Sequence, residues 1–105
     1  MKQKLSYTDR IELLLLLPTK GSFMALRAAE DLRKDLALTQ DEMKLVEMEQ
    51  DGEMLKWDLS KEAEKEHDFT EFELEVVRKS LKGLDESEEL RQTQMELYGR
   101  FVENE

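Results

Sequence analysis

The chain has 105 residues, with 26 Asp and Glu against 16 Lys and Arg, so its formal net charge at pH 7 is -10. It has no Cys and one His, His67, which excludes disulfides and thiol chemistry and leaves too little for a Ser-His-Asp triad or a typical zinc site. We therefore expect a single domain over residues 1–105 that is a binding protein rather than an enzyme, with no catalytic, cofactor-binding or metal-binding residues.

A first helix is predicted near the start of the chain. Thr8 or Asp9 can cap it, and it continues through the five leucines of residues 13–17 to Pro18. Because that segment is almost entirely apolar, we expect it at the centre of the core. After a turn, Ser22 can cap a second helix. The apolar residues of the second helix recur at three- and four-residue spacing and are Phe23, Leu26, Ala29, Leu32 and Leu36.

A short third helix and a β-hairpin should follow. Thr39 and Glu42 form a capping-box pattern, which predicts the start of the helix. Asp51 and Gly52 lie between alternating runs within residues 46–57, which is a strong hairpin signal. A two-residue loop at Asp51 and Gly52 puts apolar pairs on one face and an ion pair on the other. The predicted pairs are Gln50 with Glu53, Met48 with Leu55, Val46 with Trp57, and Glu47 with Lys56.

The next segment predicts a strand and a long helix. Residues 60–69 fit a charged loop, a frayed helix or a third strand, and we favour the strand. A second capping box at Thr70 and Glu73 starts a helix that ends near Gly83. The apolar face of this helix consists of Leu74, Val77, Leu81 and Leu84.

Asp85 or Ser87 can cap a last helix with a thinner apolar stripe. That stripe consists of Leu90, Leu97, Tyr98 and Phe101. Together the elements predict an α+β domain of about five helices with a small antiparallel β-hairpin or three-stranded sheet. The N-terminal half has a winged-helix-like order of elements.

Three helices followed by a hairpin resemble a winged helix-turn-helix, which raises a DNA-binding regulator as an alternative function. A recognition helix presents Arg, Lys, Asn or Gln to base edges. Here the third helix offers Gln40 and Lys44 beside Asp41 and Glu42, and the hairpin adds further acidic residues. The side chains therefore disfavour DNA binding, although the order of elements suggests it.

The negative charge is concentrated in the C-terminal half. Residues 1–52 have 8 basic and 10 acidic side chains, or -2, whereas residues 53–105 have 8 and 16, or -8. Such a half repels a phosphate backbone or an anionic membrane and attracts a partner protein with a basic surface, unless it only aids solubility. The candidate partner-binding residues are Glu71, Glu75, Glu86, Glu88, Glu89 and Glu96.

His67 suggests a possible metal site. Glu64 and His67 have the spacing of a di-iron helix motif, in which both side chains reach one metal. Such sites need a second copy of the motif and two further Glu, which only a dimer could supply. We therefore favour a solvated histidine in a charged connector.

We see no membrane or targeting segment. The leucine run of residues 13–17 is far shorter than the roughly 20 residues that cross a bilayer. Glu12 adjoins it, and Pro18 and Lys20 stand where a signal peptide would have small residues. With no Cys to require an oxidising compartment, the expected location is cytoplasmic.

Three segments resemble a known group of proteins. Residues 14–26 (LLLLPTKGSFMAL), 39–42 (TQDE) and 97–101 (LYGRF) look like small uncharacterised proteins of tailed phages and prophages. That family has no established activity, so no residue inherits a role from it. The resemblance implies a phage setting, in which small acidic proteins frequently bind host proteins, sometimes occupying a nucleic-acid site with their own carboxylates.

The expected function is therefore that of a small acidic, non-enzymatic, phage-type accessory protein. It would bind a protein partner and inhibit a host nucleic-acid-binding protein by acidic mimicry, in the host cytoplasm. The alternatives are the winged-helix-like DNA-binding regulator and a structural or assembly component that oligomerises through an apolar patch. A homodimer is compatible with the sequence.

Overall fold

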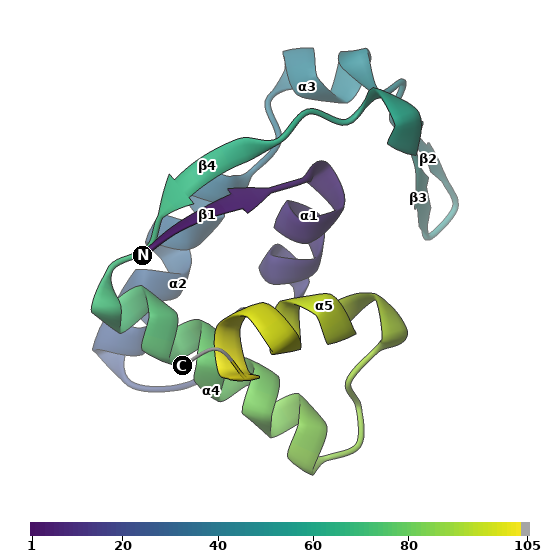
Figure 1. The fold of residues 1–105 in the computed structure, drawn as a ribbon. Helices are drawn as coiled ribbons and strands as arrows, with labels where there is room; N and C mark the ends of the chain where they lie inside the picture. Colours follow the sequence, from purple (N-terminus) through teal and green to yellow (C-terminus); the bar gives the residue numbers. More distant parts are fainter. Residues whose placement is uncertain (104–105) are drawn as a thin grey trace.

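Helices make up most of the chain, and they pack beside two small antiparallel sheets (Figure 1). The computed structural model describes residues 1–103. Its strands are β1 (Lys2–Leu5), β2 (Glu49–Asp51), β3 (Met54–Lys56) and β4 (Lys65–Asp68). Its α-helices are α1 (Tyr7–Leu16), α2 (Phe23–Leu36), α3 (Gln40–Leu45), α4 (Glu71–Glu86) and α5 (Met95–Tyr98). The short 3₁₀ helices are η1 (Leu59–Lys61) and η2 (Gln92–Gln94), and η3 (Gly99–Glu103) is a π-helix. The α+β class is confirmed, and none of the described helices has the length and apolarity of a membrane span.

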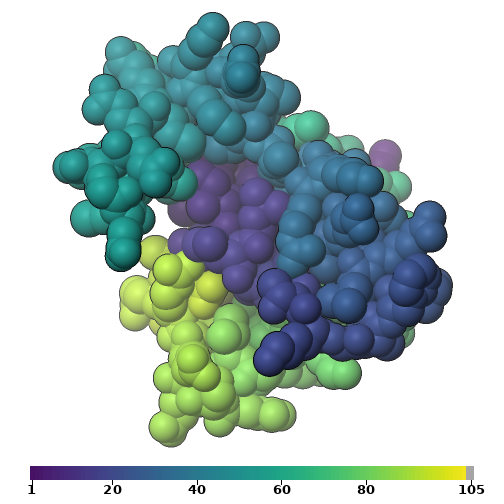
Figure 2. Space-filling model, turned by 180° about the vertical axis from the view of Figure 1, so that it is seen from behind, coloured from purple at the N-terminus to yellow at the C-terminus, as the bar shows by residue number. Residues whose placement is uncertain are grey.

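The core lies where α1, α2, α4 and the C-terminal helical segment meet. Figure 2 shows the N-terminal residues at the centre of one face, framed by the hairpin region, α2 and the C-terminal segment. The leucine run at the end of α1 is only partly in the core: Leu13, Leu16 and Leu17 are buried as expected. Leu15 is 62% exposed, because consecutive helical positions face different directions. Phe69 and Phe101 meet edge to face with ring centroids 5.2 Å apart. Phe23, expected on the inner face of α2, is 73% exposed because it stands at the first position of that helix.

Most of the predicted helix starts are confirmed. Ser22, Thr39 and Thr70 cap α2, α3 and α4, the last two with complete capping boxes. The predicted start of α1 was wrong, because the N-cap is Ser6 and not Thr8 or Asp9. Asp9 instead completes the capping box by accepting a hydrogen bond from the Ser6 backbone N–H at 3.1 Å.

The predicted strand in residues 60–69 forms as β4, but its partner is unexpected. It pairs with β1 rather than with the hairpin, so two two-stranded sheets take the place of a three-stranded one. The register puts Lys2 opposite Asp68 and Lys4 opposite Glu66, so opposite charges face one another across the two strands. The hairpin thus stands apart from the other sheet, which weakens the likeness to a winged helix.

The predicted hairpin forms, with a different register. Asp51 pairs with Met54, so the two-residue loop is Gly52 and Glu53, one residue later than expected. Gly52 has φ +64°, which fits a type II′ turn with Gly at its first central position. Lys56 consequently lies opposite Glu49 rather than Glu47. Every residue of both strands is exposed, so no buried face enforced the register we predicted.

The last helix begins later than predicted. Helix α4 continues to Glu86 and includes Asp85, and Ser87 is its C-cap. Glu88 has φ +60°, a left-handed conformation that ends the helix. The C-terminal helical segment starts only after Arg91, whose backbone N–H donates to Gln94 Oε1 at 3.0 Å.

Arg10 ties the first three helices together. Its side chain is completely buried in α1. Its Nε donates to the carbonyl of Leu36 at 3.0 Å and its Nη2 to that of Ala37 at 2.8 Å, at the end of α2. The guanidinium also makes a bidentate pair with Glu42 of α3, at 2.6 and 3.1 Å. The hydrogen bond from Arg10 lowers the pKa of Glu42 to about 2, although its partial burial acts in the opposite direction.

Glu42→Gln should therefore lower the free energy of unfolding at pH 7 by about 3 kcal/mol, because it leaves the buried Arg10 charge without a counter-ion. Gln can still complete the capping box with Thr39. Since the folded-state pKa of Glu42 lies below its ordinary value, its stabilising contribution is present above about pH 4.5 and is lost as the pH falls toward about 2.

Urea unfolding of both proteins across this pH range measures the effect. The difference between wild type and variant should shrink steadily below pH 4.5. A control variant, Glu30→Gln, removes the exposed Glu30–Lys34 pair and should change stability little at any pH. A difference that stays constant down to pH 2 would contradict the assignment to Glu42.

Candidate functional site

All six glutamates predicted to bind a partner are exposed, but they do not form one surface. Glu71 and Glu75 lie in the first half of α4, and Glu96 lies in α5. Glu75 and Glu86 share a shallow groove whose charge is mixed, because Arg78, Lys79 and Lys82 also line it. Glu96 is already paired, because its Oε1 lies 3.7 Å from Nη1 of Arg100.

The remaining three glutamates gather at one turn. Asp85, Glu86, Glu88 and Glu89 stand within five consecutive positions where α4 ends, and we call these four residues the acidic turn. All four are exposed. Within residues 1–103, none of the four takes part in an ion pair. Among the six predicted residues and their neighbours, the acidic turn is therefore the densest group of carboxylates without an ion pair. Of its four residues, Glu86 lines the groove that also holds basic side chains.

The backbone of the acidic turn is a Schellman motif. The Glu89 N–H donates to the carbonyl of Leu84 at 2.8 Å, and the Glu88 N–H donates to that of Asp85 at 3.1 Å. Glu88 occupies the left-handed position, at φ +60°, where glycine is the usual residue. The chain thus has a glutamate at a position that penalises any side chain other than that of glycine.

The acidic turn is also electrostatically unfavourable for α4. The C-terminal end of a helix has a partial negative charge, so carboxylates there are repelled, and basic residues are preferred. The last turn of α4 has no basic residue. Nearby, burial and the negative charge of Asp85 raise the pKa of Tyr98, whose hydroxyl lies 3.4 Å from Asp85 Oδ2. Two local preferences are thus broken at one place, a combination that favours a functional site. Glu47, at the end of α3, has the same left-handed conformation, at φ +53°, so the carboxylates around Glu88 are what set this turn apart.

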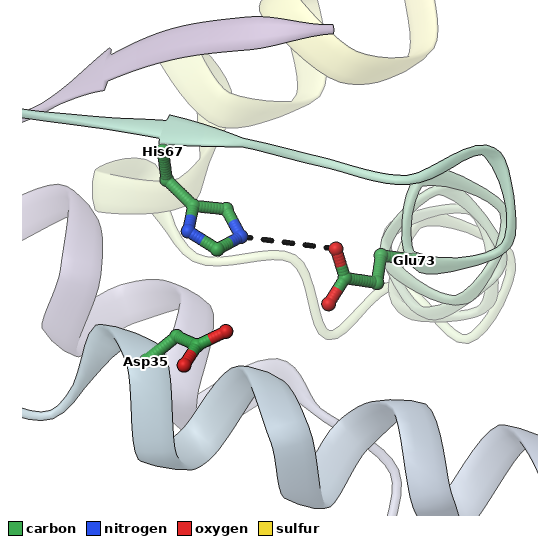
Figure 3. A group of neighbouring side chains, drawn as sticks. All are labelled: Asp35, His67 and Glu73. Carbon is green, nitrogen blue, oxygen red and sulfur yellow. Dashed lines mark ion pairs between the residues drawn. The ribbon is translucent and has the colours of Figure 1, made fainter.

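A second cluster joins three elements and was not predicted. Asp35 in the last turn of α2, His67 on β4 and Glu73 in the first turn of α4 point toward one another (Figure 3). His67 Nε2 lies 3.8 Å from Glu73 Oε1, and it is a buried nitrogen with no hydrogen-bond partner among the described residues. The ligating atoms of the three residues all lie within 4.8 Å of one another.

Glu64, which the sequence pairs with His67, does not belong to this cluster. It is exposed and precedes β4, where the chain is extended rather than helical. Residues three apart in an extended chain point to opposite faces, so the helical motif does not form. Asp35 and Glu73 could not be found from spacing alone, because they approach His67 only through the packing of α2 and α4.

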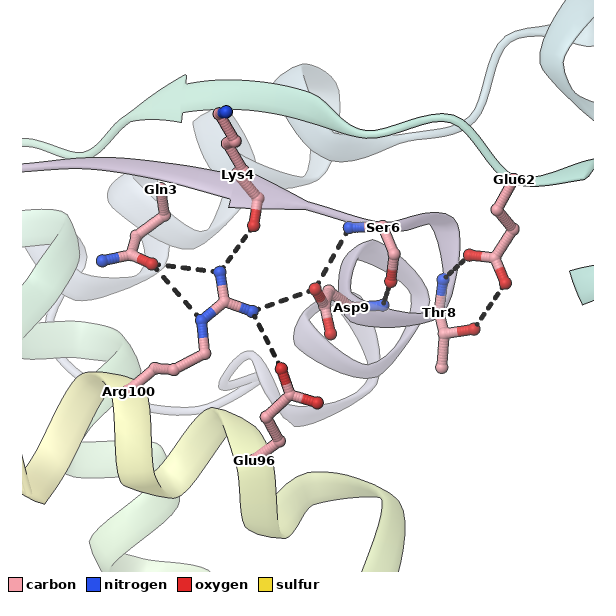
Figure 4. A network of polar contacts seen from close by, with 8 residues as sticks. All are labelled: Gln3, Lys4, Ser6, Thr8, Asp9, Glu62, Glu96 and Arg100. Carbon is pink, nitrogen blue, oxygen red and sulfur yellow. Dashed lines mark hydrogen bonds and ion pairs between the residues drawn. The ribbon is translucent and has the colours of Figure 1, made fainter. Parts of the chain in front are cut away.

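Arg100 holds the two ends of the described chain together (Figure 4). It donates to Gln3 Oε1, to the Lys4 carbonyl and to Asp9 Oδ2, the last at 3.0 Å. Glu96 completes this network, which gives it a structural role. Beside it, Glu62 accepts hydrogen bonds from the backbone and hydroxyl of Thr8 at 2.7 and 3.0 Å. These polar contacts are therefore part of the fold.

An exposed apolar patch lies where the starts of α2 and α4 adjoin. Phe23, Met24 and Phe72 line one depression and are 73%, 61% and 40% exposed. Phe23 and Phe72 each stand in the first turn of a helix, where the inner face has not yet reached the core.

The chain was compared with protein-family models, with curated proteins and with solved structures, and nothing matches it.

The unfavourable geometry of the acidic turn can be tested through stability. Glu88→Gly should raise the free energy of unfolding by about 0.5 to 1 kcal/mol, because glycine adopts the left-handed conformation without a steric penalty. Glu86→Gly, at the last helical position, is the matched control and should not stabilise. Chemical denaturation of the three proteins decides between these outcomes. A destabilised Glu88→Gly variant would show that the turn is not strained.

Proposed function

We propose that the protein is a small, non-enzymatic accessory protein that binds a partner protein with a basic surface, and that the acidic turn is the centre of the contact. The observation on which this depends is the left-handed Glu88 among unpaired carboxylates at the negative end of α4. Such a turn lowers the stability of the free protein, and a cationic partner would relieve the electrostatic part of that penalty.

Electrostatics explains what this contact would do. Exposed charges contribute mainly to the rate and specificity of association rather than to raw affinity. Four carboxylates in five positions would steer a basic patch of the partner toward the end of α4. Glu71 and Glu75 contribute less, because they lie in the first half of α4 and basic residues line the groove between Glu75 and Glu86. Glu96 also contributes less, because it is paired with Arg100.

The sharpest form of the proposal is nucleic-acid mimicry in a phage setting. The carboxylates would then occupy a phosphate-binding surface of a host protein in the cytoplasm and inhibit it. The overall charge of -10 and the exposed position of the six glutamates support this form. The acidic third helix and hairpin, by contrast, give no support to direct DNA binding.

A second candidate function is a structural or assembly component. The observation that favours it is the apolar patch of Phe23, Met24 and Phe72. Exposed aromatic residues that adjoin one another are enriched at protein interfaces. This candidate predicts a defined oligomer of the isolated protein that is insensitive to salt.

The test is a pull-down from a bacterial host lysate with mass-spectrometric identification, using two charge-matched variants. Glu86→Lys with Glu89→Lys reverses the acidic turn, and Glu53→Lys with Glu64→Lys reverses two exposed glutamates elsewhere. Each pair changes the net charge from -10 to -6. We expect the first variant to weaken binding of the purified partner about tenfold or more, or roughly 1.4 kcal/mol, and the control to weaken it far less.

Salt and mass measurements complete the test. The complex should weaken when ionic strength rises from about 0.15 M to about 1 M, as the screening length falls from about 8 Å to about 3 Å. Lysines near the end of α4 favour the helix, so weaker binding would not come from misfolding. Equal losses in both variants would argue against the acidic turn. A stable, salt-insensitive oligomer with no partner recovered would replace the proposal with the assembly component.

A further inference from the structure

The cluster of Asp35, His67 and Glu73 joins three elements that are distant in the sequence. These residues come from the end of α2, from β4 and from the start of α4 (Figure 3). We propose that the three side chains bind one divalent transition-metal ion of the Zn²⁺ type. The ion would link the three elements as a structural cross-link. This site is independent of the acidic turn, which lies at the opposite end of α4.

The donor set fits such an ion. One imidazole nitrogen and two carboxylate oxygens are ligands that Zn²⁺ accepts, at about 2.0 to 2.2 Å. Bonds of that length in a tetrahedron put ligand atoms about 3.3 Å apart. In the structure the three ligating atoms lie within 4.8 Å, and the His67–Glu73 separation is 3.8 Å. Side-chain rotations that bring the ligand atoms closer by up to about 1.5 Å would complete three positions and leave a fourth for water.

Each of the three side chains is in an electrostatically unfavourable environment, and one bound cation would stabilise all three. His67 Nε2 is buried without a hydrogen-bond partner among the described residues, and a buried polar atom in that state is costly. Glu73 is only 9% exposed, so its carboxylate is largely removed from water. Asp35 stands in the last turn of α2, where the helix dipole disfavours a negative charge. One divalent ion bound by all three groups would relieve all three penalties.

The surroundings of the cluster hold two of the ligands in place. The Thr70 backbone N–H donates to Glu73 Oε1 at 3.0 Å, which fixes that carboxylate as outer-shell hydrogen bonds do in known metal sites. The ring of His67 meets the edge of Phe69 with centroids 4.5 Å apart. Asp35, the exposed member, is free to rotate onto the ion.

The competing explanation is a simple ion pair, in which a protonated His67 contacts Glu73 without a metal. The two cases predict different changes in the NMR signals of the His67 imidazole. Because His67 is the only histidine, its imidazole signals in an NMR spectrum need no assignment by mutagenesis. Zinc binding shifts them at constant pH and in proportion to one equivalent of metal, whereas an ion pair responds to pH alone.

The experiment is a titration of the intact protein with ZnCl₂ after EDTA treatment, followed by calorimetry, thermal melting and the His67 signals. We expect one site per chain, a rise in melting temperature of several degrees with excess Zn²⁺, and saturating shifts of the His67 signals. Asp35→Asn and Glu73→Gln should each lower zinc affinity at least about tenfold. Gln at position 73 preserves the capping box with Thr70, so that variant should fold.

The control is Asp31→Asn, one turn earlier on the same exposed side of α2 and outside the cluster. It should leave zinc affinity unchanged. The proposal is overturned if Zn²⁺ leaves the His67 signals and the melting temperature unchanged. It is also overturned if Asp31→Asn lowers the affinity as much as Asp35→Asn, since zinc would then bind the acidic surface in general.

Discussion

The buried guanidinium of Arg10 is the interaction on which the arrangement of the first three helices depends. Removing a charge from water costs several kcal/mol unless every donor is satisfied. Here two donors go to carbonyls at the end of α2, which lack partners within that helix, and the others go to Glu42. Because α3 has no residue in the core, this pair fixes α3 and the hairpin that follows it. Val46, buried beside it, adds a second anchor.

The local features of the fold were predictable from the sequence, and the long-range ones were not. Caps at Ser22, Thr39 and Thr70 depend on residues three apart, which a sequence displays directly. Strand β1 was missed because it is short and charged and becomes a strand only by pairing with residues 65–68. The predicted hairpin register was wrong because both strands are exposed, so no core selects the register that puts the apolar residues on one face.

For the candidate sites, too, local features were predictable from the sequence and long-range contacts were not. Composition identified the acidic C-terminal half, but not that Glu88 takes a left-handed conformation or that Glu96 is paired with Arg100. A Glu at a glycine position leaves no pattern that distinguishes it from an ordinary helical glutamate. For His67 the sequence suggested Glu64 as partner, because spacing along a helix was the only available guide. Its neighbours, Asp35 and Glu73, meet it only once α2 and α4 have packed.

The contacts of Arg100 have a consequence for how the chain is made in the cell. Residues near position 100 bind β1 and the first turn of α1, so segments almost a whole chain apart must meet before these contacts form. Folds dominated by such distant contacts form more slowly than bundles with local ones. While the nascent chain emerges, the leucine-rich end of α1 has no α4 or C-terminal segment to cover it. During synthesis, that segment is therefore an exposed target for chaperones until the last helical residues are made.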